Sequence, residues 1–224
     1  MLTKQDYQNF KDFLLKYEEL YDKKMIKFIK DNFKSGMHSS EIVDILKQVY
    51  AYLGILPEEQ NIYKKCLDII KEEYGLEQNI LEIGAGAIPI FSMYVDEEQK
   101  NGSITAYDKY LVPNKLGNIK IYKKNFTMND STKDYNLVVG IYPCDASYML
   151  IQKAAEENKD MLLLSCDCTH FSTGYLQFNM PDIDEWHDYL YYRACTKYEN
   201  KKEIVRKKIM CGELPKTLIY TKRK

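Results

Sequence analysis

The chain has 224 residues, of which 45% are hydrophobic and 29% charged, so it can bury a full core. Its 32 basic and 33 acidic residues give a net charge of −1, which argues against an obligate nucleic-acid binder but does not exclude a local basic face. There is no apolar run of about 18 residues and no basic-then-apolar leader, and the 6 cysteines follow no disulfide-scaffold spacing. We therefore expect a soluble, cytoplasmic protein with reduced thiols and no membrane partner.

The first 75 residues have helical periodicity and almost no strand signal. Apolar stripes run from Phe10 to Ile29 and from Ile42 to Leu53. Pro57 suits the first turn of a third helix, which Gly75 would end. Because no Pro/Gly/Ser-rich linker follows, we expect residues 1–75 to form an all-helical region that packs onto the remainder.

From residue 79 the pattern changes to short apolar runs, which is typical of an α/β domain over residues 76–224. The predicted strands are 79–83, 103–107, 118–123, 135–140, 161–166, 203–211 and 217–222. The last two are joined by GELP and should form an antiparallel hairpin. An amphipathic helix containing Trp186 should precede them. The expected fold is a seven-stranded, mainly parallel sheet with a C-terminal antiparallel hairpin, preceded by the helical region.

The first predicted strand runs into a glycine loop, in the sequence NILEIGAGAIPIF over residues 79–91. Gly84 and Gly86 let the backbone pass close to a ligand at the carboxyl edge of a parallel sheet. Glu82 lies two residues before the first glycine, where its carboxylate could accept hydrogen bonds from a ligand ammonium group or from loop amides. A tight turn without a ligand is the alternative interpretation of an isolated GxG.

Further polar residues follow the next two strands. Asp108 ends the second strand, where a carboxylate can accept hydrogen bonds from both hydroxyls of a ribose. Asn125 and Phe126 follow the third strand, where an amide and a ring could hold an adenine. Acids at two successive strand ends around a glycine loop favour a nucleoside-containing ligand.

This arrangement resembles the class I S-adenosylmethionine-dependent methyltransferases over about residues 76–224. The resemblance implies that the loop surrounds the methionine part of S-adenosyl-L-methionine, while Asp108 holds the ribose and Asn125 and Phe126 the adenine. The implied cofactor-binding set is Glu82, Gly84, Ala85, Gly86, Asp108, Asn125, Phe126 and Gly140. Two departures are Ile88 or Pro89 where a third glycine is usual, and the long separation of Asp108 from Gly86.

Three other interpretations stay open. An NAD-binding oxidoreductase would share the loop and the ribose acid, but Pro89 has no N–H for a pyrophosphate and Glu82 would repel one. The GAGAIP loop behind helices is also similar to nicotianamine-synthase-type enzymes, which transfer an aminobutyrate group. A non-catalytic binding module with the same fold is the third.

The fourth strand ends in GIYPCDAS, which places Tyr142 and Asp145 as the candidate catalytic residues. The order of these residues does not fit the D/N-P-P-aromatic motif of amino-nitrogen methyltransferases. It is similar to the L-H-x-C-D/G-A segment of another methyltransferase group, some of whose members are thought to act on RNA. We therefore expect methyl transfer to an unidentified small molecule or RNA, with residues 1–75 capping the acceptor pocket.

Two further clusters combine chemically active residue types. Cys166, Cys168 and His170, with Cys144 opposite, suggest a metal site, but zinc sites prefer two or more residues between paired cysteines, so ordinary thiols are expected. Tyrosines beside lysines, such as Tyr122 before Lys123, could stack on bases, while the basic C-terminal tail usually forms a solvated face.

Overall fold

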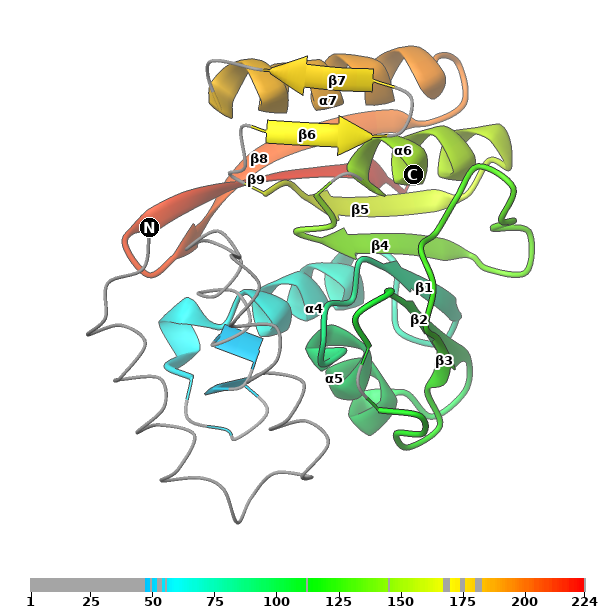
Figure 1. Cartoon of the computed structure of the whole chain (residues 1–224), viewed down its shortest axis with the longest axis vertical. Helices are drawn as coiled ribbons and strands as arrows, with labels where there is room; N and C mark the ends of the chain where they lie inside the picture. The colour runs from blue at the N-terminus through cyan, green and yellow to red at the C-terminus, as the bar shows by residue number, and fades with distance from the viewer. Residues whose placement is uncertain are drawn as a thin grey trace.

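A computed structural model describes most of the chain from residue 47 onward (Figure 1). The described residues are 47, 48, 50, 51, 54, 56–111, 113–144, 146–166, 170–173, 176–179 and 183–223, without side chains for 170–173 and 176–179. The helix predicted at Phe10 to Ile29 lies outside this part of the chain. Of the helix predicted at 42–53, residues 47, 48, 50 and 51 are described, and they are helical.

The described part of the chain contains both helices and strands, and its strands begin near residue 79 as the apolar runs predicted. The helices are η2 (Glu58–Gln60), α4 (Ile62–Glu73), α5 (Ile90–Glu98), α6 (Ala146–Glu156) and α7 (Ile183–Lys197). The strands are β1 (Asn79–Ile83), β2 (Ser103–Tyr107), β3 (Lys120–Tyr122), β4 (Leu137–Ile141), β5 (Asp160–Leu164), β6 (His170–Thr173), β7 (Leu176–Asn179), β8 (Glu203–Cys211) and β9 (Leu214–Lys222).

Seven of the described strands form one sheet in the order β3-β2-β1-β4-β5-β9-β8. The pairs from β3 to β5 are parallel, and β9 joins β5 and β8 antiparallel. The predicted seven-stranded sheet with its C-terminal hairpin is confirmed. Some details differ from the prediction. β9 begins at Leu214, which shortens the predicted GELP connection, and β6 and β7 form a separate hairpin that was not predicted. The bounds of β3, β4 and β5 differ from the predicted ranges by one to two residues.

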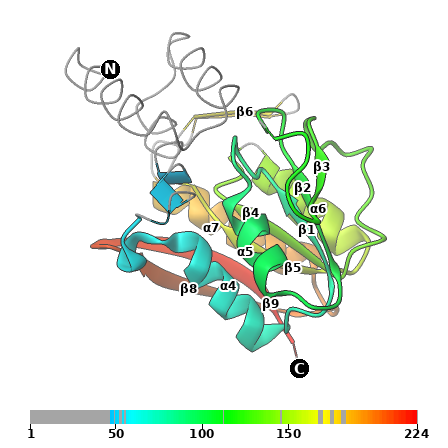
Figure 2. The ribbon, with the colours of Figure 1, turned by 90° about the horizontal axis from the view of Figure 1, so that it is seen from below.

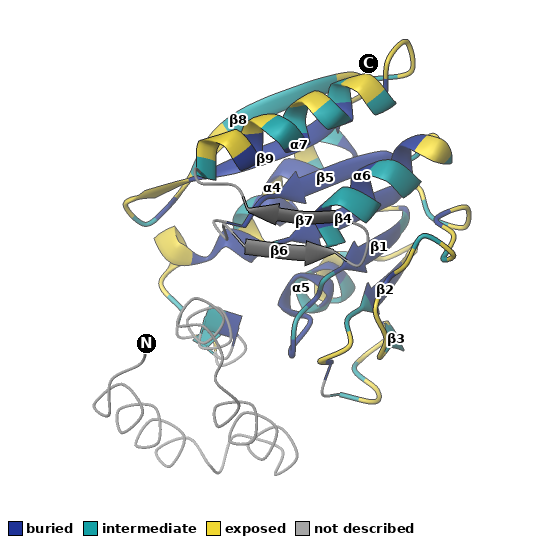
Figure 3. Ribbon diagram, turned by 45° about the horizontal axis from the view of Figure 1, so that its top comes forward, coloured by how far each residue is buried: buried dark blue, intermediate teal, exposed yellow. Residues whose placement is uncertain are grey.

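Alternate residues of the central strands feed two apolar cores, one on each face of the sheet. Ile80, Val139 and Leu162 pack on the face that α4 and α5 cover. Leu81, Val138 and Leu163 pack on the face of α6 and α7. Figure 2 shows α4 beside α5, and Figure 3 shows that β1, β4 and β5 are buried while the tip of the β8–β9 hairpin is exposed. This layering leaves the carboxyl edge of the parallel strands for loops.

The helix α4 links the N-terminal region to the first strand, and its ends follow ordinary capping rules. The side chain of Asn61 accepts a hydrogen bond from the Lys64 N–H at the N-terminus. At the other end Gly75 has a φ of +72°, as the sequence predicted for a helix-ending glycine. Cys66 and Ile70 are completely buried in the core that α4 shares with the sheet.

The opposite, amino edge of the sheet is held by a buried ionic network around Asp160. Its carboxylate accepts hydrogen bonds from Lys202 Nζ at 2.5 Å, from Arg223 Nε at 2.8 Å and from Thr221 Oγ1 at 3.2 Å. Arg223 also donates to the backbone oxygen of Tyr74 at 2.8 Å. This network ties the end of β9 to the start of β5 and to the end of α4.

No helix in the described ranges is both long enough and apolar enough to cross a lipid bilayer.

We predict that Asp160→Ala lowers the free energy of unfolding by about 2–4 kcal/mol, because it leaves two cations and a hydroxyl without their shared acceptor. Urea denaturation measures the change. The matched control is Asp188→Ala, since Asp188 pairs with Arg206 through a carboxylate that is 52% exposed, and we expect a loss below about 1 kcal/mol. Equal losses in the two variants would contradict a structural role for the network.

Candidate functional site

The glycine loop leaves β1 at the carboxyl edge of the sheet, between β2 on one side and the turn after β4 on the other. Gly84 and Gly86 have φ values of +76° and +74°, which favour glycine. A Cβ on Gly84 would lie 2.7 Å from Pro143 Cα, so the two loops touch through their backbones. The neighbour that this geometry shows for Gly84 is the protein itself, and the close approach of a ligand to the two glycines stays a prediction.

Glu82 points into the core rather than toward the open edge. It is 1% exposed, and its Oε2 accepts hydrogen bonds from Ser92 N at 3.2 Å and from Ser92 Oγ at 2.5 Å. Ser92 lies in the first turn of α5, where a carboxylate satisfies unpaired N–H groups and complements the helix dipole. Burial raises the pKa of Glu82 to about 7, opposed by the two hydrogen bonds from Ser92.

Asp108 joins the glycine loop to the end of β2. Its Oδ2 accepts from Gly86 N at 2.9 Å and its Oδ1 accepts from Tyr110 N at 2.8 Å. Burial raises the pKa of this carboxyl group, while the two backbone N–H groups oppose the shift. The carboxylate predicted to bind a ribose thus also fixes the loop, and each of its oxygens retains a lone pair for a further donor.

Most N–H groups of the loop donate to acceptors within the protein. Gly84 N and Ala85 N both donate to the backbone oxygen of Tyr107, at 2.9 and 3.2 Å. Gly86 N donates to Asp108, and Ile88 N donates to the Gln48 side chain at 3.4 Å. The loop therefore presents glycine Cα surfaces, rather than a row of free amides, to a ligand at this edge.

Gln48 is a site residue that the sequence analysis missed. Its side chain is buried against the loop, with Nε2 3.5 Å from the backbone oxygen of Ala85 and Oε1 accepting from Ile88 N. A Cβ on Gly86 would lie 2.0 Å from Gln48 Nε2. Nothing in the sequence indicated this role, because the contact between Gln48 and Ile88 joins residues forty positions apart and depends on how the helix packs against the loop.

The predicted adenine-binding pair divides between core and surface. Phe126 is 4% exposed and packs edge-on against Tyr107, with the ring centroids 5.6 Å apart. Asn125 is exposed beside it. The Phe126 ring thus packs against the last residue of β2 within the core. Of the two residues, only Asn125 has a side chain that a ligand at the surface could contact.

The turn after β4 holds the candidate acceptor-side residues. Tyr142 and Cys144 have φ values of 55° and 45°, which are strained for residues with side chains and typical of functional turns. Gly140 lies in β4, and a Cβ there would meet Leu150 Cδ1 at 2.6 Å, so its small size serves the packing of α6. Asp145, the second candidate catalytic residue, lies outside the described residues.

Lys216 is a second residue that the sequence analysis missed. It is 8% exposed, and its Nζ lies 5.9 Å from the centroid of the Tyr142 ring. Lys216 belongs to β9, one residue before Thr217, whose backbone oxygen accepts from Ser165 N beyond the carboxyl end of β5. The antiparallel hairpin thus places the buried residue Lys216 beside the turn after β4. Only the pairing of β9 with β5, some fifty residues apart in the chain, reveals this position.

The cysteines do not assemble into a metal site in the described part of the chain. No group of three potential ligands lies together there. Cys166 is 2% exposed, and its backbone oxygen lies 3.4 Å from His187 Nε2. Cys168 lies outside the described residues, as does the side chain of His170. His187 lies on the inner face of α7 and is buried.

The raised pKa of Glu82 predicts a pH-dependent stability. Because the folded-state pKa is about 7 and the ordinary value is 4.5, the folded protein binds the proton more tightly than the unfolded chain. The contribution is fully present below pH 4.5 and is lost as the pH rises through 7. Glu82→Gln should therefore reduce the decline in the free energy of unfolding across this window by about 2–3 kcal/mol. Urea denaturation at several pH values tests this, and an unchanged decline would contradict it; the exposed Glu58→Gln is the control.

The contact between Gly86 and Gln48 predicts a coupling between two distant residues. Gly86→Ala should cost about 2–4 kcal/mol, from left-handed backbone strain plus displacement of Gln48, and about 1–2 kcal/mol in a Gln48→Ala background, where the strain remains. Gly75→Ala is the matched control, because its φ is +72° and nothing lies within 4 Å of the added Cβ. A cost for Gly86→Ala that is independent of residue 48 would show that the contact does not form.

No family model matches this sequence, and no curated protein matches it either. Solved structures do match. The chain is similar to a methyltransferase from Pyrococcus furiosus, with a TM-score of 0.50 and 14% identity, over 71% of this chain and 82% of that one. It is also similar to a SAM-dependent methyltransferase from Aquifex aeolicus (TM-score 0.45, 14% identity, 73% and 90% covered) and to a putative hemolysin from Lactococcus lactis (0.47, 12%, 72% and 86%). At such identities the likeness concerns the fold alone: the chain shares its fold with the Pyrococcus furiosus methyltransferase.

Proposed function

We propose that this protein is an S-adenosyl-L-methionine-dependent methyltransferase. The observation that carries the proposal is the meeting of the glycine loop and the Asp108 carboxylate at the carboxyl edge of a sheet with the methyltransferase fold. Ligands of open α/β sheets bind at this edge, where the strand order reverses between β1 and β4. The chemistry of the edge then decides which ligand fits.

The loop amides favour a sulfonium nucleoside over a dinucleotide. A pyrophosphate needs free backbone N–H groups, whereas those of Gly84, Ala85 and Gly86 donate to Tyr107 and Asp108. A cationic amino acid instead gains from the nearby carboxylate of Asp108 and from close contact with the glycine Cα atoms. We therefore favour S-adenosylmethionine over NAD as the ligand.

The residues of the chain would act chiefly by binding and orientation. S-adenosylmethionine, when bound, supplies a methyl group on a sulfonium sulfur. Asp108 would hold the ribose hydroxyls through its remaining lone pairs, and the glycines would leave room for the methionine part. Tyr142 would position the acceptor through its ring, because its hydroxyl oxygen is buried. Asp145 stays the candidate for removing a proton, and alignment supplies most of the rate.

The N-terminal region is proposed to cap the acceptor side of the site. The described end of that region already reaches the glycine loop through Gln48. A cover over the edge would exclude water and hold an acceptor in line with the methyl group. The acceptor is proposed to be a small molecule or an RNA, in a cytoplasmic protein.

Asp108→Ala should weaken S-adenosylmethionine binding by about 1.5–3 kcal/mol, because a charged hydrogen-bond partner is lost and the Gly86 amide is released. Isothermal titration calorimetry measures the affinity. Asp134→Ala is the control, since that exposed carboxylate precedes β4 at the opposite edge. A folded Asp108→Ala protein with unchanged affinity would remove Asp108 from the site.

The ligand and the reaction are tested separately. Titration with S-adenosylhomocysteine and NAD distinguishes the methyl donor from a dinucleotide, and preferential binding of NAD would overturn the proposal. Release of S-adenosylhomocysteine in the presence of candidate acceptors distinguishes an enzyme from a binding module of the same fold.

A further inference from the structure

The segment that connects the ends of β2 and β3 differs in charge from the rest of the chain. Between residues 109 and 124 it contains five lysines and no acidic residue, in a protein whose net charge is −1. Lys109, Lys115, Lys120, Lys123 and Lys124 are all exposed. We call these five residues the lysine surface. It begins directly after Asp108 and ends directly before Asn125, so it borders the candidate site.

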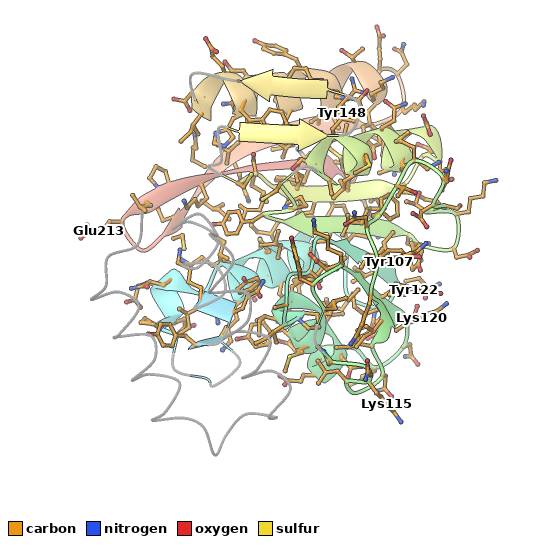
Figure 4. The ribbon with its side chains drawn as sticks, in the orientation of Figure 1. Tyr107, Lys115, Lys120, Tyr122, Tyr148 and Glu213 are labelled. Atoms are coloured by element: carbon orange, nitrogen blue, oxygen red, sulfur yellow. The ribbon has the colours of Figure 1, made fainter. Side chains whose placement is uncertain are left out.

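Aromatic rings hold this surface in place. Tyr107 and Tyr122 are paired residues of β2 and β3, and their rings stack with centroids 4.6 Å apart. Lys120 Nζ lies 5.1 Å from the Tyr122 centroid, and Lys124 Nζ lies 5.4 Å from the Tyr107 centroid. Figure 4 shows Tyr107, Tyr122 and Lys120 together at the β3 end of the sheet, with Lys115 on the loop before it. The helices α6 and α7 pack farther along, on β4, β5 and β8.

Acidic partners neutralise little of this charge. Lys124 pairs with Asp130 at 2.5 Å, and Asp96 accepts a hydrogen bond from the Asn118 backbone. Among the described residues, Lys109, Lys115 and Lys120 form no ion pair. Four basic residues near the C-terminus are different, because each of them has an acidic partner. Lys202, Arg206, Lys208 and Arg223 all pair with aspartates.

We propose that the lysine surface binds single-stranded RNA and guides it to the candidate site. The lysines would supply phosphate contacts along the edge strand β3 and the loop before it. The Tyr110 ring, 45% exposed, can stack on an unpaired base. The exposed amides of Asn118 and Asn125 can both donate to and accept from a ribose 2′-hydroxyl. Use of the bound RNA as methyl acceptor rests on the proposed function, whereas binding does not.

Binding is tested by fluorescence anisotropy of a fluorescein-labelled, mixed-sequence single-stranded RNA of roughly 12 nucleotides. With about four lysines on phosphates, the logarithm of the association constant should fall with the logarithm of salt concentration with a slope of about −3. The variant Lys115→Glu/Lys120→Glu/Lys123→Glu should bind at least about tenfold more weakly at low salt, with a slope shallower by about 2.

The matched control is Lys100→Glu/Lys133→Glu/Lys222→Glu. It changes the net charge equally, but its exposed lysines precede β2, precede β4 and end β9, at the opposite edge of the sheet. We expect it to retain RNA affinity within about threefold, since long-range charge is screened by salt. Glutamine versions of both triple variants, with thermal unfolding of each, separate lost contacts from lost folding.

Equal weakening in both triple variants, or no RNA binding by the unaltered protein, would overturn the proposal. Tighter binding to a DNA duplex of equal length or to anionic phosphatidylserine vesicles would overturn the assignment to RNA. S-adenosylmethionine affinity, measured on the same variants, should be unchanged. If the unaltered protein binds S-adenosylmethionine but not RNA, RNA binding by the lysine surface is contradicted and the proposed methyltransferase function stands. If it binds RNA but not S-adenosylmethionine, the proposed methyltransferase function is contradicted and RNA binding stands.

Discussion

The tight packing around the glycine loop is the constraint on which the site depends. A Cβ at Gly84 would collide with the backbone of Pro143, and a Cβ at Gly86 would collide with Gln48. These contacts bring three remote segments together: the turn after β1, the turn after β4 and the end of the N-terminal helical region. The end of β2 is a fourth segment, because Asp108 accepts a hydrogen bond from the Gly86 N–H. The loop is thus preorganised before any ligand arrives, and binding would not have to order it.

The two edges of the sheet differ in their polar interactions. At the amino edge the Asp160 network closes β5, β9 and α4 with charged hydrogen bonds. At the carboxyl edge the chain carries left-handed turns at Tyr142 and Cys144, and carboxyl groups at Glu82 and Asp108 whose pKa values are raised by burial. Raised pKa values and strained turns both cost stability, and such features concentrate at functional sites.

The fold, rather than the composition, decides which charged residues lie next to an opposite charge. The basic C-terminal strands lie beside acidic residues of α7, so Arg206 and Lys208 pair with Asp188 and Asp184. The loop before β3 lies at the end of the sheet opposite β8, where it has few acidic neighbours. The positive charge of its lysines is therefore little neutralised. A net charge near zero therefore conceals a cluster of five exposed lysines between residues 109 and 124.

Much of the fold was readable from the sequence, because strand burial and helix capping are local signals. The runs around Leu81, Val138 and Leu163 predicted central strands of a parallel sheet, and Gly75 predicted a helix end. Gly84, Gly86 and Asp108 were placed at the carboxyl edge, since glycines and acids directly follow apolar strands. Tertiary structure decided what these residues touch. It turned Glu82 inward onto the first turn of α5, placed Phe126 under Tyr107 in the core, and brought Gln48 and Lys216 to the edge from opposite ends of the chain. Periodicity reports which face of an element is apolar, but a contact between residues far apart in the chain depends on how whole elements pack.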